Sequence, residues 1–222
     1  MPRPSQNLDL ALLQAGHALF PDAGCARLSV RAVAAAAGVN VGMFHYHFRS
    51  KDDFLRALLA QVYEDVFQGL GAAAAAEPEA LPALRQGLIG AATVLQRHRR
   101  TIARLWMDAL EGQPVAVEFL RANAPLHLGG LAALVARAQA EGALQPLPPL
   151  QCVAMLFGAV ALPLVFAAGM VEVAMPPDFQ QAFASQVATP QAVAQRVDLV
   201  LAALAVPQPL PAKAPRRTRR TA

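Results

Sequence analysis

Apolar residues recur along most of the chain at the three- to four-residue spacing of amphipathic helices. The first such run predicts a helix over residues 8–20. Two short runs follow, over residues 30–37 and 41–48, and between them stands Gly38, a residue type that commonly ends helices. Alternation of β-branched residues, which would indicate strands, is hard to find. The pattern therefore predicts an all-α protein whose second and third helices are only about two turns long.

Capping residues support these helix boundaries. Ser29 and Asn40 precede the two short helices, where their side chains can accept a hydrogen bond from a free backbone N–H. Ser50 followed by Asp53 forms a capping box, which predicts a long fourth helix that runs to about residue 70 and links two parts of the chain.

The rest of the chain is also helical in its pattern. The alanine run 72–76, with Pro78 and Pro82, marks a boundary, and Pro125 interrupts one of the helices beyond it. We expect nine or ten helices in all. The later ones are predicted over residues 84–96, 102–110, 115–140, 150–173, 179–183 and 189–205.

Residues 29–48 fit a helix-turn-helix motif, which needs a short helix, a tight turn and a second helix that can enter the major groove of DNA. Phe44 and Phe48 can face inward, whereas Val41 and Met43 lie at the N-terminal end of the second helix, where base edges are reached. Gly42 between them permits a close backbone approach.

The distribution of charge agrees with a polyanionic partner. The chain has 19 basic and 15 acidic residues, but residues 57–206 hold eight basic against eleven acidic ones. The basic residues are therefore concentrated at the two ends. We divide the chain into a DNA-binding domain (1–52), a helical domain (53–206) and a basic, proline-containing tail (207–222) that we expect to be disordered.

The segment LSVRAVAAAAGVNVGMFHYHFRSKDDFLRALL, residues 28–59, resembles the DNA-binding segment of the TetR/AcrR family of transcriptional regulators. The resemblance implies a homodimer that binds double-stranded DNA, and it assigns contacts with bases or phosphates to nine residues. His45 replaces the tyrosine usual at its position, so the phosphate contact there should depend on pH. The nine are Ser29, Arg31, Val41, Gly42, Met43, His45, Tyr46, His47 and Lys51.

The same resemblance implies that the helical domain dimerises and binds a small molecule that releases the protein from a palindromic operator. Few charged residues occur on its central helices, so we expect an apolar or aromatic effector. The bulky side chains there are candidates to line its cavity, although ordinary core packing explains each equally well. They are Trp106, Met107, Phe119, His127, Met155, Phe157 and Phe166.

Two other functions stay open at this point. The uncharged segment 152–171 is long enough to span a membrane, although Pro163 and the lack of flanking basic residues argue against it. A DNA-binding activator without an effector would have the same sequence features.

Catalysis, metal binding and export find no support in the sequence. Neither a nucleophile elbow, a phosphate loop nor a zinc-protease motif occurs. Cys25 and Cys152 lie far apart and outside any metal-binding spacing. We therefore expect no enzyme activity, cofactor or metal. The N-terminus lacks a secretion signal, which favours a cytoplasmic location.

Overall fold

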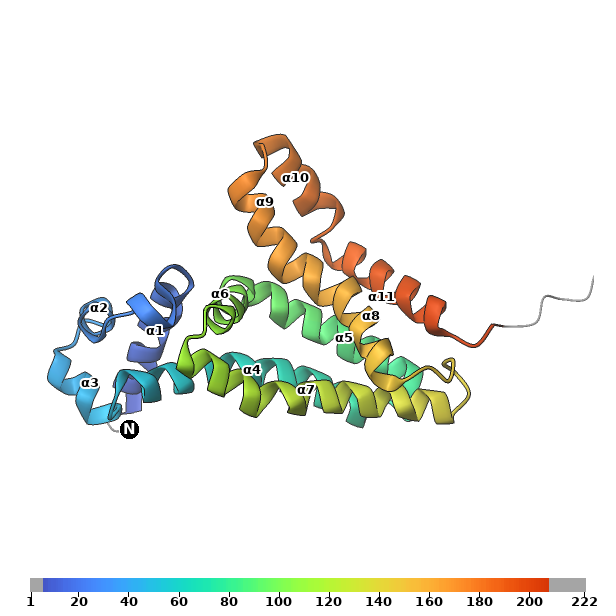
Figure 1. Ribbon diagram of the computed structural model, residues 1–222, viewed down its shortest axis with the longest axis horizontal. Helices are drawn as coiled ribbons and strands as arrows, with labels where there is room; N and C mark the ends of the chain where they lie inside the picture. The colour runs from blue at the N-terminus through green and yellow to red at the C-terminus, as the bar shows by residue number, and fades with distance from the viewer. Residues whose placement is uncertain (1–5, 208–222) are drawn as a thin grey trace, which may run out of the picture.

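The computed structural model describes residues 6–207, and within that range it is built from helices, with a single isolated β-bridge between Leu144 and Ala205 (Figure 1). The all-α prediction is confirmed. The elements are α1 (Gln6–Arg27), α2 (Val30–Ala36), α3 (Val41–His47), α4 (Lys51–Ala76), α5 (Ala80–Arg97), α6 (Arg99–Leu110), α7 (Pro114–Ala140), α8 (Pro149–Leu162), η1 (Pro163–Ala167), α9 (Ala168–Ala174), α10 (Pro177–Gln186) and α11 (Pro190–Leu204).

The N-terminal helices form a small unit at one end of the molecule (Figure 1). Phe20, Phe44 and Phe54 are fully buried there, and the ring of Phe54 lies 5.2 Å from that of Phe44 and 5.0 Å from that of Phe48. Because Phe54 belongs to the first turn of α4, the long linker helix is anchored in this core.

The predicted caps are confirmed. Oγ of Ser29 accepts a hydrogen bond from the Ala32 N–H at 3.1 Å, and Oδ1 of Asn40 accepts one from the Met43 N–H at 2.9 Å. Gly38 has a φ of 70°, a conformation that glycine adopts without strain. The turn between α2 and α3 therefore has the geometry that the sequence predicts.

The C-terminal helices pack around an aliphatic core. Its members come mainly from α5, α7, α8 and α11, and Leu84, Leu156 and Val197 are among those with no exposed surface. The long helices α4 and α7 run along this unit, and α9 and α10 project from it (Figure 1).

Several boundaries differ from the prediction. α1 continues through Pro21 to Arg27 and breaks at Gly24, whose φ is 62°. α4 continues through the alanine run to Ala76, because alanine favours helix more strongly than any other residue. Pro125 is accommodated inside an uninterrupted α7. The predicted tail lies, from residue 208 onward, outside the described residues.

α8, η1 and α9 together form the predicted apolar helix, Pro149–Ala174, so the described residues contain ten helices. Its length and composition would allow it to cross a membrane, as a buried core helix would also allow. One face packs in the aliphatic core through Cys152, Leu156 and Val160. The π-helical turn η1 follows from Pro163, which lacks the N–H that a regular helix requires.

Candidate functional sites

The outer surface of α3 presents most of the residues that the sequence assigns to DNA. Val41, Gly42, His45 and Tyr46 are exposed, and 74% of Tyr46 is accessible to solvent. Phe44, on the opposite face, is fully buried and fixes the helix against the aromatic core. The helix therefore offers a mixed apolar and polar surface on a rigid support.

The remaining predicted DNA contacts surround this surface. Ser29 and Arg31 are exposed at the start of α2, and Met43, His47 and Lys51 are half-buried. The structure thus brings all nine residues onto the α2–α3–α4 junction. Nε2 of His47 is buried and has no partner among the described residues, which leaves Nδ1 as the nitrogen to face DNA.

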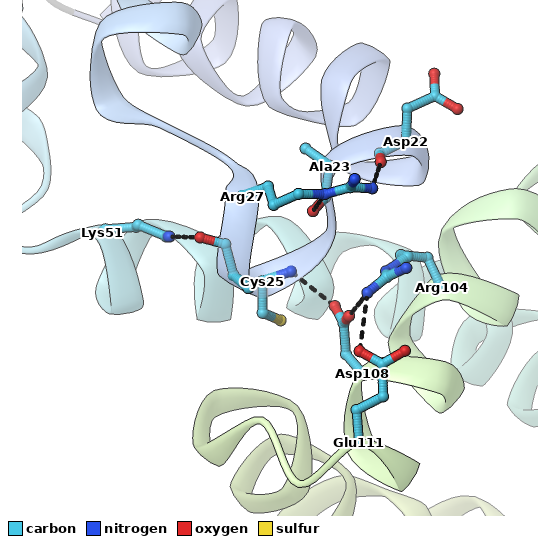
Figure 2. Close-up of polar contacts among 9 residues, drawn as sticks. Asp22, Ala23, Cys25, Arg27, Lys51, Arg104, Asp108 and Glu111 are labelled. Carbon is cyan, nitrogen blue, oxygen red and sulfur yellow. Dashed lines mark hydrogen bonds and ion pairs between the residues drawn. The ribbon is translucent and has the colours of Figure 1, made fainter.

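Two cations beside this surface are held by backbone carbonyls. Nζ of Lys51 donates to the carbonyl of Ala26 at 2.9 Å, and Arg27 donates to the carbonyl of Asp22 at 2.6 Å (Figure 2). The sequence interpretation did not include Arg27. Its position directly before the cap Ser29 is the signal that could have identified it.

A cavity of about 460 Å³ lies between α4, α5, α6, α7 and the α8–η1 helix. Charged side chains are absent from its described lining, and Tyr63, Trp106 and His127 supply the polar atoms. The volume falls within the range of small-molecule sites, roughly 300–1,000 Å³. The cavity is therefore suited to an uncharged, largely apolar molecule.

Its polar groups are arranged on two sides. His127 of α7 directs Nδ1 to the carbonyl of Asn123 at 3.0 Å and Nε2 to that of Tyr63 at 3.3 Å, so its nitrogens are engaged by the protein. The Tyr63 ring packs edge-on against His127, and burial raises the pKa of Tyr63 to about 12. Trp106 stands edge-on to Phe166, with 6.5 Å between the ring centroids.

Four of the seven predicted cavity residues line it, namely Trp106, His127, Phe157 and Phe166. The other three do not. Met107 and Met155 are 46% and 42% exposed, and Phe119 is buried in the N-terminal core against Tyr63.

The sequence interpretation missed the contribution of α4. Tyr63, Val66 and Leu70 of this helix line the cavity. Their spacing of three and four residues defines a second apolar face on the linker helix, and that spacing could have been recognised in the sequence.

Comparisons with known proteins agree with this arrangement. Residues 12–58 match the family described as bacterial regulatory proteins, tetR family. The HTH-type transcriptional repressor Rv3405c of Mycobacterium tuberculosis is 32% identical over 146 residues, which cover 63% of this chain and 71% of that protein.

Solved structures share the whole fold. The ketosteroid transcriptional regulator KstR2 of Mycobacterium tuberculosis is 17% identical with a TM-score of 0.64, over 93% of this chain and 97% of that one. SmeT in complex with triclosan is 25% identical with a TM-score of 0.70, over 93% and 100% of the two chains. The helix-turn-helix, the ten-helix fold and the identity to Rv3405c together place this chain in the TetR family, as a DNA-binding transcriptional regulator.

Proposed function

We propose that the protein is a dimeric repressor that binds a palindromic operator and is released from it by an uncharged apolar or aromatic molecule. The observation that carries this proposal is the cavity of about 460 Å³, whose described lining holds no charged side chain. One of its walls is α4, the helix that begins beside the DNA-reading surface. We place the protein in the cytoplasm, where its DNA lies.

For the contact with DNA, we assign α3 to the major groove. Val41 and Met43 can contact thymine methyl groups, and Gly42 allows the backbone to approach the bases. Tyr46 and Lys51 are placed to donate to phosphates, which sets the position of the protein on the duplex. Few bidentate contacts with bases are available, so DNA shape should contribute to the choice of operator.

For the dimer, we assign the exposed apolar side of the α8–α9 helix together with α11. Met170 and Val173 are 60% and 90% exposed, and Leu199 of α11 is 71% exposed. Patches of this kind usually mark an interface. Two recognition helices must meet successive major grooves about 34–36 Å apart, which a dimer achieves and a monomer does not.

The ligand acts by preferring one arrangement of the subunits. A molecule that binds more tightly to the arrangement with the wrong spacing of the recognition helices weakens DNA binding by the same factor by which DNA weakens its own binding. KstR2 and SmeT are described by a ketosteroid and by triclosan, respectively. Apolar compounds of these two kinds are therefore suitable first probes.

The DNA-binding part is tested by fluorescence anisotropy at a stated salt concentration, with DNA from the promoter of the protein's own gene. Tyr46→Ala and Lys51→Ala should each weaken binding, and Arg121→Ala, an exposed cation of α7, serves as a control for the loss of charge. Specific binding that is equal in all four proteins would contradict the proposed surface.

The ligand part is tested by thermal unfolding with triclosan and a ketosteroid. A ligand that binds only the folded state raises Tm in proportion to its saturation. Ala161→Phe places a ring in the cavity and should abolish that shift, together with the release of DNA. Release of DNA without any dependence on Ala161 would place the ligand elsewhere.

A further inference from the structure

Helix α6 joins the two functional regions because it has two faces. Ile102 and Trp106, one turn apart, line the cavity. Arg104 and Asp108, also one turn apart, face the end of α1 and contact each other. A shift of two residues turns a helix by about 200°, so these two pairs lie on opposite sides of α6.

The second face holds a buried carboxylate with two kinds of donor. Asp108 has no exposed surface. Its Oδ1 accepts from Nε of Arg104 at 2.7 Å, and its Oδ2 accepts from the backbone N–H of Cys25 at 2.7 Å (Figure 2). Arg104 also approaches Glu111, at 3.4 Å. The carboxylate thus ties α6 to the backbone of the DNA-binding domain.

The break in α1 gives this pair access to the backbone. Gly24 has φ 62° and ψ −173°, a conformation that is essentially restricted to glycine. A Cβ atom there would lie 2.3 Å from Nε of Arg104 and 2.7 Å from Oδ1 of Asp108. The close contact between α6 and this turn therefore requires glycine for two separate reasons.

The neighbouring peptide group holds the DNA-facing lysine. Asp108 binds the N–H of Cys25, and the carbonyl of the next residue, Ala26, accepts from Nζ of Lys51 at 2.9 Å (Figure 2). An ammonium group has three donors, so Lys51 retains two for a phosphate. Burial first, and then the nearby Asp108, raise the pKa of the Cys25 thiol to about 12, while Lys51 and Arg104 act in the opposite direction.

We propose that Asp108, held by Arg104, is a positioning residue for DNA binding: it fixes the Cys25–Ala26 turn, and that turn holds the Lys51 ammonium where it meets a phosphate. This inference rests on the proposed DNA-binding surface. It gives a buried residue of the ligand-binding region a defined role in contact with DNA, through two consecutive residues of backbone. Because Trp106 is on the same helix, a ligand that displaces α6 also displaces this turn.

The test compares two variants that carry the same charge. Asp108→Asn keeps an oxygen that can accept from the Cys25 N–H, and Asp108→Ala removes it. The measurement is the slope of log K against log salt for promoter DNA, which reports the number of phosphates neutralised. A Lys51→Ala variant and the Lys51→Ala/Asp108→Ala double variant complete a double-mutant cycle.

We expect Lys51→Ala to lower the slope by roughly 0.9 per subunit. Asp108→Ala should lower it by a similar amount, Asp108→Asn should restore most of it, and the double variant should be no worse than Lys51→Ala. A general loss of structure would weaken affinity without this selective change in slope or its dependence on Lys51.

The outcomes separate the two proposals. If the wild type binds no DNA, the proposed function fails and this inference fails with it. If Lys51→Ala lowers the slope but Asp108→Ala leaves it unchanged, or the two effects add, only the positioning role is overturned. Should Asp108→Ala not unfold cooperatively, Arg104→Met/Asp108→Leu replaces it, because buried ion pairs are often replaced by apolar groups without loss of stability.

Discussion

The N-terminal and C-terminal cores of this protein use their aromatic residues in opposite ways. In the N-terminal core, Phe20, Phe44 and Phe54 are fully buried and fill the interior. In the C-terminal unit, the core is made of Ala, Leu, Val and Cys, and rings such as Phe157 and Trp106 border a cavity instead. The part that reads DNA is therefore densely packed, and the part that senses a ligand keeps space for it.

This difference has a physical basis in what each region must do. A recognition helix of seven residues is too short to be stable alone, so its orientation depends on tight packing below it. A sensor has to gain contacts when a ligand arrives, and it can do so only if its own side chains leave room. Stability should therefore respond differently to equivalent changes in the two regions.

The largest effect is expected from truncating a ring in each core. Phe54→Ala should lower the free energy of unfolding by about 3–5 kcal/mol, because it removes a ring with no exposed surface from a filled core. Phe157→Ala should cost less than about 1 kcal/mol, because this ring is already 38% exposed and borders space. Both are measured by chemical denaturation.

Protein concentration must be equal in these measurements, because dimerisation contributes to apparent stability. Equal losses in the two variants would mean that the C-terminal rings support the fold as strongly as the N-terminal ones. The contrast between the two cores would then be wrong.

The sequence contained most of the N-terminal half of this comparison. Cap residues such as Ser29 and Asn40 act locally, so their hydrogen bonds follow from the residue type and its position. The nine predicted DNA contacts share one junction because they lie close together in sequence. Their roles stay predictions.

The cavity was harder to predict because it depends on contacts between distant segments. A bulky residue on a central helix, such as Met107 or Phe119, can face solvent or the neighbouring core, and its type does not reveal which. The buried contact between Asp108 and the Cys25 N–H joins residues 83 positions apart. Such a contact has no local signature, so periodicity in the sequence cannot show it.

A smaller effect is expected from adding a methyl group in each region. A Cβ atom on Gly16 would lie 2.5 Å from Cζ of Phe54 and 2.6 Å from Cδ1 of Leu58. Gly16→Ala should therefore destabilise the protein by about 1–3 kcal/mol through overpacking. Gly129 of α7 has open space around its Cβ position. Gly129→Ala should stabilise the helix by up to about 1 kcal/mol.

Both glycine variants are compared with wild type by thermal and chemical unfolding. The signs of their effects should be opposite. Destabilisation by Gly129→Ala equal to that by Gly16→Ala would show that α7 is as tightly enclosed as α1, contrary to the structure.

The smallest effect at neutral pH is expected from the two groups whose ionisation is suppressed by burial. Burial raises the pKa of Cys25, in the N-terminal core, and of Tyr63, in the cavity wall, to about 12 in each case, from 9.0 and 10.0. A raised pKa means that the folded state keeps its proton where the unfolded state has lost it. Stability from these groups is complete below pH 9 and is lost as the pH rises towards 12.

Cys25→Ala and Tyr63→Phe should each make the loss of stability at alkaline pH less steep, and the first should act from about pH 9 and the second from about pH 10. The measurement is the free energy of unfolding between pH 8 and 12, relative to wild type. Only Tyr63 borders the cavity, so a ligand that displaces water there should raise its pKa further and leave that of Cys25 unchanged. An alkaline titration of tyrosinate absorbance with and without ligand tests this, and an equal shift at both groups would mean that the N-terminal core also senses the ligand.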